Sequence, residues 1–373
     1  MSRGFRLFKV LGIQISVDYT WFAIFVLFSW SLASGYFPSM YPGLGPARYF
    51  FMGVASSLLL FVCVLIHEIS HSYTANRLGL DIHEITLFIF GGVAQLTKEP
   101  EDPYTELKIA IAGPAASAVL AIFFLAVSRL IPGDSFPVAK AITSYLTTIN
   151  VVLLIFNMIP GFPLDGGRVF RALWWARTGD INGATRVASA IGKGFAVFLI
   201  ALGLLQIFVG NFTGGLWSVL IGIFVQQAAE SGYRQVLVKN ALNGLKVSDL
   251  MSRDVVTINE EIDLADAVEK YFFKYHHSCF PVSSGGRVAG LLTLANIRGI
   301  ERDLWGETLV RDIMTRIGKD ETLSPTDSAI DAMTRLANTE AGRIVVMERG
   351  DLAGIISRRD IMKVLELKAE FRR

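Results

Sequence analysis

The segment His67-Glu68-Ile69-Ser70-His71 places two imidazoles and a carboxylate within five residues. In a helix, residues i and i+4 lie on one face with Cβ atoms about 5–6 Å apart, so His67 and His71 can bind one Zn²⁺. Glu68 lies about 100° around the helix from His67 and can reach a water molecule beside the metal without ligating it. The motif therefore predicts metal-assisted hydrolysis with Glu68 as the general base.

The motif lies in a long apolar stretch, and this setting decides between two interpretations. The alternative to a metal site is a buried pair of histidines that only satisfy each other, which suits a helix of a soluble protein. Inside a membrane span, two histidines and a glutamate cost several kcal/mol of insertion free energy, so such groups mark a functional site by default. We therefore expect His67, Glu68 and His71 to belong to a metal centre.

A catalytic zinc needs a third protein ligand and an open position for water. The best candidate is Asp165, which follows a proline- and glycine-rich segment that breaks a helix near the membrane surface. Non-helical backbone at membrane depth is tolerated only where it is buried or lines a cavity. The alternative is that Asp165 caps a turn. His83, His276 and His277 suit the third position less, since they lie in a polar turn and in the soluble part of the chain.

The apolar composition identifies the elements that must position these residues. Of the 373 residues, 52% are hydrophobic and 18% are charged, which excludes a disordered chain and an ordinary soluble enzyme along the whole length. The net charge of +2 is too small to indicate a nucleic-acid-binding protein. We predict a polytopic α-helical membrane domain whose spans approach the roughly 20 residues that a bilayer needs. The six expected spans are Val17–Ser34, Tyr49–Ala75, Leu107–Ile131, Ile142–Ile159, Ile191–Val209 and Gly215–Ala229.

Basic residues gather in alternate loops between these spans. Arg3, Arg6 and Lys9 precede the first span, and further arginines and lysines follow the second, fourth and sixth. The positive-inside rule then places both termini in the cytoplasm. We expect the membrane to be that of a bacterial or archaeal cell. The basic start also fits a cleaved signal peptide, whose removal would leave five spans.

The rest of the chain reads as a soluble α/β protein with an internal repeat of about 63 residues. Val247–Met251 (VSDLM) recurs as Val310–Met314 (VRDIM), and Gly290–Ile297 (GLLTLANI) recurs as Gly354–Ile361 (GIISRRDI). Each copy predicts a strand, a helix, two short strands and a helix. The predicted boundaries are 1–232 for the membrane domain, 233–245 for a linker, 246–304 for the first repeat and 305–373 for the second.

An HExxH in a transmembrane helix followed by N-x-x-P-x-x-P-L-D-G-G resembles the site-2 protease family of intramembrane zinc metalloproteases. Six spans followed by a tandem repeat resemble its subgroup with cystathionine-β-synthase-like (CBS) domains. The resemblance implies that His67, His71 and Asp165 ligate one zinc, that Glu68 is the catalytic glutamate and that Asn157 assists the substrate or the oxyanion. It also implies a transmembrane protein substrate in the lipid bilayer, such as an anti-sigma factor or a membrane-tethered regulator.

Two further segments resemble parts of the same family. Ala112–Ser117 (AGPAAS) resembles the Gly-Pro stretch of the third span, although Ser117 stands where we expect asparagine. Small residues there also permit close helix packing. Phe88–Leu96 (FIFGGVAQL) resembles a membrane-embedded β segment whose edge binds an unwound substrate by β-addition, and an ordinary loop is the alternative.

The resemblance of the tandem repeat to CBS pairs implies a regulatory site for an adenine nucleotide (ATP, ADP or AMP). It assigns Ser357 and Asp360 of the second copy, and Thr293 of the first, to ribose contacts, whereas Asn296 replaces the second aspartate. A purely structural module that forms a homodimer is the alternative. Because CBS pairs also accompany transporters and channels, the alternative functions are a CBS-regulated transporter or channel and a catalytically inactive binding protein.

Overall fold

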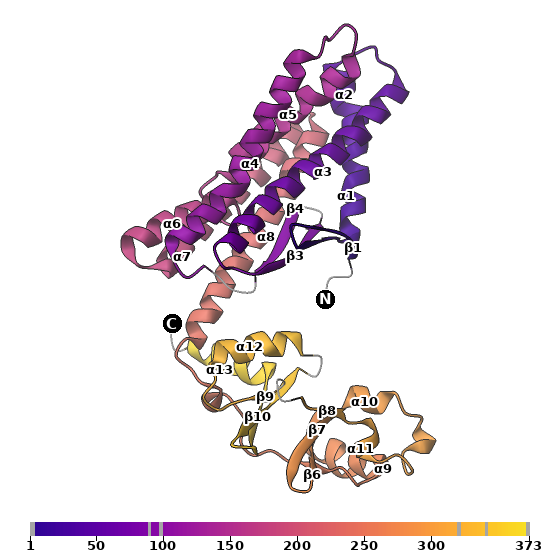
Figure 1. Ribbon diagram of the computed structural model, residues 1–373, viewed down its shortest axis with the longest axis vertical. Helices are drawn as coiled ribbons and strands as arrows, with labels where there is room; N and C mark the ends of the chain where they lie inside the picture. The colour runs from indigo at the N-terminus through magenta and orange to yellow at the C-terminus, as the bar shows by residue number, and fades with distance from the viewer. Residues whose placement is uncertain (1–3, 89–90, 97–99, 319–321, 340–341, 371–373) are drawn as a thin grey trace. The chain divides into compact units, whose positions relative to one another are not determined.

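The computed structural model describes residues 4–88, 91–96, 100–318, 322–339 and 342–370 of the chain. These residues form two compact units that meet in sequence between Val236 and Leu237 (Figure 1). The helices of the first unit are α1 (Tyr19–Ser31), α2 (Phe37–Met40), α3 (Pro46–Arg77), α4 (Pro103–Leu130), α5 (Pro137–Asn157), α6 (Asp165–Thr178), α7 (Ile181–Phe208) and α8 (Phe212–Leu242). Its strands are β1 (Phe5–Val10), β2 (Ile13–Val17), β3 (Ile82–Phe88) and β4 (Gly91–Leu96).

Six helical segments of the described chain are long and apolar enough to cross a membrane, which confirms the predicted number. They are Tyr19–Met40, in which a π-helical turn joins α1 to α2, and the five helices α3, α4, α5, α7 and α8. Large apolar side chains on these helices point outward: Ile122 is 67% exposed and Phe208 is 87% exposed. A bilayer covers apolar surface of this kind, so the first unit is an integral, multi-pass membrane domain.

Proline and aspartate residues set where the helices of the site begin. α3 and α4 start at Pro46 and Pro103, whose missing N–H and fixed φ suit the first helical position. The Asp102 carboxylate accepts a hydrogen bond of 2.9 Å from the Thr105 N–H and so caps α4. α4 therefore begins with Glu106 in its first turn.

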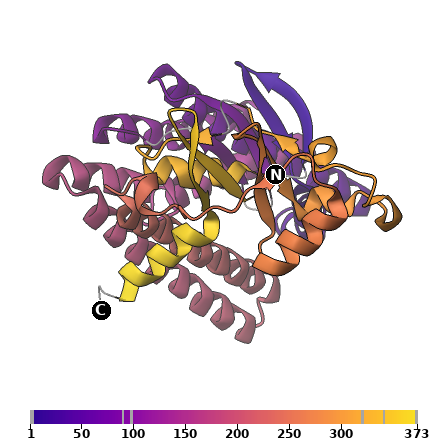
Figure 2. The same ribbon diagram turned by 90° about the horizontal axis from the view of Figure 1, so that it is seen from below.

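A four-stranded sheet in the order β1-β2-β3-β4 packs against α3, and its β1–β2 hairpin is plain in Figure 2. β2 and β3 are parallel and the outer pairs are antiparallel. The face toward α3 buries Ile15 and Ile85 against Leu65, which precedes the HExxH motif, and Ile69, which lies within it. Of the predicted β segment Phe88–Leu96, residues 91–96 form the edge strand β4 and Phe88 ends β3, whereas residues 89 and 90 lie outside the described chain.

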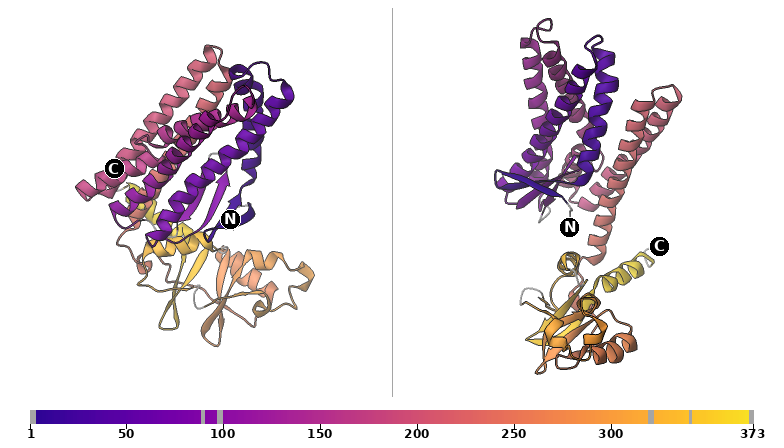
Figure 3. Two further views of the ribbon diagram at one scale, coloured as in Figure 1. Left: turned by 45° about the horizontal axis from the view of Figure 1, so that its top comes forward. Right: turned by 90° about the vertical axis from the view of Figure 1, so that its right-hand side faces the viewer.

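α4 is the central helix of the site and packs against α3, α5 and α6 (Figure 3). The non-helical segment before α6 rests on α7, where the Phe162 N–H donates to the Ala188 carbonyl at 3.0 Å. A Cβ on Gly192 would lie 1.9 Å from the Phe162 carbonyl oxygen, so glycine is required for this close approach. The segment ahead of Asp165 is therefore held against protein, as irregular backbone at membrane depth must be.

The second unit contains two copies of one strand-helix-strand-strand-helix pattern, which confirms the predicted repeat. In the first copy β5 pairs in parallel with β6, which is antiparallel to β7, and in the second copy β9, β10 and β11 pair in the same way. The first copy contains β5 (Ile258–Asn259), α9 (Leu264–Ala267), β6 (Cys279–Ser284), β7 (Arg287–Thr293) and α10 (Leu294–Arg298), followed by α11 (Val310–Ile313) and β8 (Thr315–Arg316). The second contains β9 (Thr322–Leu323), α12 (Ala329–Asn338), β10 (Arg343–Glu348), β11 (Asp351–Ser357) and α13 (Arg358–Glu370).

The leading motif of each repeat packs into the core of the other copy. Val247 and Leu250 join the core that holds Leu323 of the second copy, whereas Val310 joins the core that holds Ile258 of the first. The boundaries 246–304 and 305–373 therefore describe the repeat in the sequence, and the two leading motifs are exchanged in space.

The last turn of α8 belongs to the second unit. α8 extends to Leu242, so most of the segment predicted as a linker, 233–245, is helical. Leu242 is 1% exposed and lies in the core of the second copy. Lys368 of α13 donates to the Ala241 carbonyl at 2.8 Å and so satisfies the C-terminal end of α8.

Candidate metal centre

Three side chains predicted as ligands converge at one point of the first unit. The Nε2 atoms of His67 and His71 lie 3.1 and 3.2 Å from the same oxygen, Oδ2 of Asp165, and 3.2 Å from each other. Ligands placed tetrahedrally at about 2.0–2.1 Å from zinc are roughly 3.3–3.4 Å apart, so this donor set fits a zinc ion. Both histidines are buried, and α3 and α6 supply the three side chains.

The second nitrogen of each imidazole is held by α4. His71 Nδ1 lies 2.7 Å from the Ile109 carbonyl oxygen, which can only accept, so Nδ1 carries the proton and Nε2 presents its lone pair to the site. His67 Nδ1 lies 3.0 Å from the Ser117 hydroxyl, where the same tautomer is satisfied. Partners of this kind orient metal-binding histidines in zinc sites.

Gly113 lets the backbone of α4 approach both imidazoles. A Cβ at this position would lie 2.2 Å from His71 Nε2 and 2.6 Å from His67 Nε2. From the sequence, the small residues of this stretch could serve either helix packing or the site. In the structure they serve both. The signal was available, because Gly113 and Ser117 have the same four-residue spacing as the two histidines on the facing helix.

Glu68 lies on the side of α3 that faces the sheet. A Cβ on Gly92 of β4 would lie 2.5 Å from Glu68 Cγ, so the glutamate side chain packs directly against the backbone of this strand. The glutamate is therefore next to the three ligands but outside their cluster, as the 100° offset along the helix predicts. It stands between the candidate metal site and the edge strand.

Among the described residues, the other candidates of the membrane domain are not part of the ligand group. Asn157 is the last residue of α5 and is half-buried. Among the described residues, no hydrogen bond joins its amide to His67, His71 or Asp165. His83 is exposed on β3 and does not join the ligand group.

The residues assigned to a nucleotide form helix caps in both CBS copies. The Ser357 N–H and hydroxyl donate to Asp360 Oδ2 at 2.8 and 2.6 Å, at the start of α13. The Thr293 N–H and hydroxyl donate to Asn296 Oδ1 at 2.9 and 2.6 Å, at the start of α10. The two copies therefore share one capping geometry, and they differ in the charge of the residue at the third helical position, Asn296 or Asp360.

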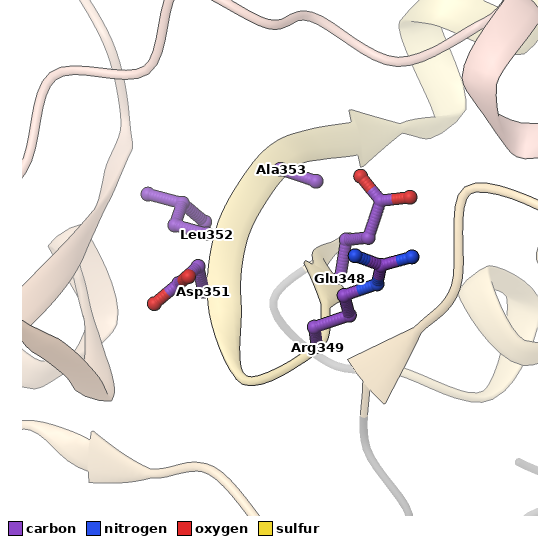
Figure 4. Close-up of a pocket in the computed structure, with 5 residues that line it drawn as sticks. All are labelled: Glu348, Arg349, Asp351, Leu352 and Ala353. Atoms are coloured by element: carbon purple, nitrogen blue, oxygen red, sulfur yellow. The ribbon is translucent and has the colours of Figure 1, made fainter.

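A surface hollow of the second unit lies at the turn between β10 and β11 (Figure 4). Its lining comes from this hairpin alone, and none of the three residues predicted to bind nucleotide belongs to it. The lining residues are Glu348, Arg349, Asp351, Leu352 and Ala353.

A zinc-type ligand set with an adjacent glutamate, inside a bundle of membrane-spanning helices, defines a membrane-embedded metallopeptidase joined to a tandem CBS unit. The family model of peptidase family M50 matches residues 55–144 and 134–202, and the CBS-domain model matches residues 247–302 and 310–367. The chain belongs to peptidase family M50, the site-2 protease family of zinc metalloproteases.

Two relatives align with this chain over nearly its whole length. The zinc metalloprotease MJ0392 of Methanocaldococcus jannaschii is 32% identical over 377 residues, which cover 100% of both chains. Rip3 of Mycobacterium tuberculosis is 31% identical over 370 residues, which cover 98% of this chain and 94% of that protein. The solved site-2 protease from M. jannaschii aligns with 32% identity over 62% of this chain and 95% of that chain, with a TM-score of 0.43. The sequence relatives confirm the predicted enzyme class, a zinc metalloprotease.

Proposed function

We propose that this enzyme is an intramembrane zinc endopeptidase that cleaves transmembrane segments of membrane-bound regulatory proteins, such as anti-sigma factors or membrane-tethered regulators. One observation carries the proposal: His67, His71 and Asp165 present three donor atoms within about 3.2 Å of one another, from a membrane-spanning helix and the helix start beside it.

The chemistry follows from the placement of the side chains. His67, His71 and Asp165 would hold the zinc, which would polarise a peptide carbonyl and make water more acidic. Glu68 accepts the proton of the attacking water and delivers it to the amide nitrogen as the C–N bond breaks. Asn157, at the end of α5, would donate to the developing oxyanion. The residue after it already packs against the start of α6, where a Cβ on Gly166 would lie 2.3 Å from the Met158 carbonyl oxygen.

The edge strand β4 supplies a way to present the substrate. A transmembrane helix hides its peptide groups in internal hydrogen bonds, so the segment to be cut must unwind first. β4 lies at the end of its sheet, and Gly92 of this strand contacts Glu68. A substrate strand added to β4 would therefore run past the general base. With both termini in the cytoplasm, the cut falls toward the cytoplasmic side of the substrate span.

Cleavage in lipid vesicles tests this function. The full chain is reconstituted with a single-span membrane protein, and the new termini are mapped by mass spectrometry. We expect cuts within the cytoplasmic half of the span for the wild type and none for Glu68→Gln, which keeps the size of the side chain but cannot accept the proton. Cuts only in soluble segments, or equal cleavage by Glu68→Gln, would contradict the proposal.

We further propose that the second unit binds an adenine nucleotide at Ser357 and Asp360 and so regulates cleavage. The first copy suggests a variant that tests the charge alone. Asn296 occupies there the position equivalent to Asp360 and accepts the same hydrogen bonds. Asp360→Asn should therefore keep the helix cap and lose the charge. We expect calorimetry to measure heat of binding when ATP, ADP or AMP is added to the wild-type full chain, and to show weaker binding for this variant. No heat with any of the three would count against the site.

A further inference from the structure

A buried carboxylate at the start of α4 contacts the helix that carries Asp165. Glu106 is completely buried, and its Oε1 accepts from Arg171 Nε at 2.8 Å and from a terminal nitrogen of the same guanidinium. Arg168 Nε lies 3.9 Å from the same oxygen. Both arginines belong to α6, within two turns of its first residue, Asp165. Glu106 thus anchors the beginning of α6 to α4.

Arg171 also contacts the segment on the other side of Asp165. Its guanidinium carbon lies 4.9 Å from the centre of the Phe162 ring, three residues before Asp165. The arginine therefore connects three things: the buried carboxylate on α4, the helix that follows Asp165 and the non-helical segment that precedes it. A shift of this arginine would move the carboxylate of Asp165 relative to the two histidines.

Glu106 is one of four residues on a single stripe of α4 that faces the site. Ile109, Gly113 and Ser117 follow it at intervals of three or four residues, which places all four on one face of the helix. Ile109 and Ser117 hold the imidazoles and Gly113 gives them room. Glu106 completes the set, because it reaches the third ligand through α6.

The cost of burying Glu106 argues for a role beyond holding the helices together. Among the described residues, none forms a hydrogen bond with its second oxygen, Oε2, which is buried. A buried carboxylate with an unsatisfied oxygen is expensive, and apolar residues of similar volume often stabilise a fold as well or better. A polar pair at this place instead fixes the orientation of α6, since two nitrogens of the planar guanidinium of Arg171 converge on one carboxylate oxygen, Glu106 Oε1.

We infer that Glu106 is a positioning residue, which acts through Arg171 to hold Asp165 at the distance from His67 and His71 that the metal requires. The inference rests on the proposed zinc site. Partners that orient a metal ligand typically contribute about 10- to 100-fold in metal affinity. We expect a change of that order when the pair is lost.

The test compares zinc affinity and ligand geometry in the full chain, purified in detergent. Glu106→Met combined with Arg171→Met replaces the pair by apolar side chains, and Glu106→Gln serves as a second variant should the double variant fail to fold. Zinc affinity is measured by competition with a chromophoric chelator, and geometry by the visible spectrum of the cobalt-substituted protein. Glu230→Gln is the matched control, since it removes an exposed pair with Arg234 at 2.8 Å on α8.

We expect the double variant to melt at or above the wild-type temperature in its metal-free form, to bind zinc at least about 10-fold more weakly and to have an altered cobalt spectrum. The control should match the wild type in all three readouts. Wild-type affinity and spectrum in a folded double variant, or in Glu106→Gln, would overturn the inference. His67→Ala separates the two proposals: if it binds zinc like the wild type, the zinc site itself is wrong, whereas zinc loss in this variant alone leaves the site standing and removes only the role of Glu106.

Discussion

At the scale of single residues, the site depends on which nitrogen of each imidazole carries the proton. Because the Ile109 carbonyl can only accept, His71 carries its proton on Nδ1. The Ser117 hydroxyl can accept the Nδ1 proton of His67 in the same way. Three atoms with lone pairs then meet within about 3.2 Å, an arrangement that a bound cation would stabilise. The groups that contact the two Nδ1 atoms, the Ile109 carbonyl and the Ser117 hydroxyl, are therefore as much a part of the site as the ligands.

Ser117→Ala tests this point, because it leaves the His67 Nδ1–H without its acceptor in a buried place. We expect zinc affinity to fall by about 10-fold or more, measured by chelator competition. Ser128→Ala is the control, since it removes another buried serine of α4, which bonds to Ser144 at 2.9 Å. Equal losses in both variants would show that the effect is one of helix packing only.

Gly113→Ala adds a methyl group where the two Nε2 atoms approach the backbone of α4. The added Cβ would lie 2.2 Å from His71 Nε2, so the imidazole must leave its position and the zinc content should drop to near the background. Gly194→Ala on α7, where a Cβ would meet nothing within 4 Å, should keep the wild-type zinc content. A fully loaded Gly113→Ala protein would contradict the geometry of the site.

At the scale of elements, local patterns were predictable and partners across the fold were not. His67, Glu68 and His71 follow from spacing within one helix, and Asp165 follows from the break in the apolar pattern before it. Glu106 and the Ile109 carbonyl could not be found in this way, because their roles depend on which faces of α3, α4 and α6 meet. The exchange of the two leading motifs could not be predicted for another reason. VSDLM and VRDIM are so alike that either one suits either core.

The strand β6 carries a thiol whose reactivity reports the packing of the second unit. Cys279 is buried against Leu291 and Val345, and burial raises its pKa to about 11 from an ordinary 9.0. In a Cys63→Ala background we expect alkylation at pH 8 to be roughly 100-fold slower than in urea, since the reactive thiolate is rarer by that factor. The thiol ionises first in the unfolded chain, so the stability of this unit should also fall as the pH rises from about 9 to 11. Fast labelling of the native protein would contradict this packing.

At the scale of the whole molecule, the boundary between the two units falls inside a helix. α8 crosses the membrane domain and ends in the core of the second CBS copy, where Leu242 is buried. The sequence predicted a linker over 233–245, yet α8 continues to Leu242. The functional unit of the CBS part therefore includes the last turn of α8.

Fragments of the second unit test this boundary. A fragment of residues 237–373 should melt roughly 5 °C or more above one of residues 246–373, which lacks Leu242. Within the longer fragment, Leu242→Ala should cost about 2–5 kcal/mol of unfolding free energy, whereas Leu237→Ala, at a position that is 43% exposed, should cost little. Equal melting temperatures for the two fragments would place the boundary after the helix.

The measurement that tests the central claim most directly is the metal content of the intact protein, purified in mild detergent without chelators and analysed by mass spectrometry. We predict about one zinc per chain for the wild type and for Glu68→Gln, because Glu68 lies outside the ligand cluster, and a large loss for Asp165→Ala. A wild type without zinc, or an Asp165→Ala protein that keeps it, would contradict a catalytic zinc held by His67, His71 and Asp165.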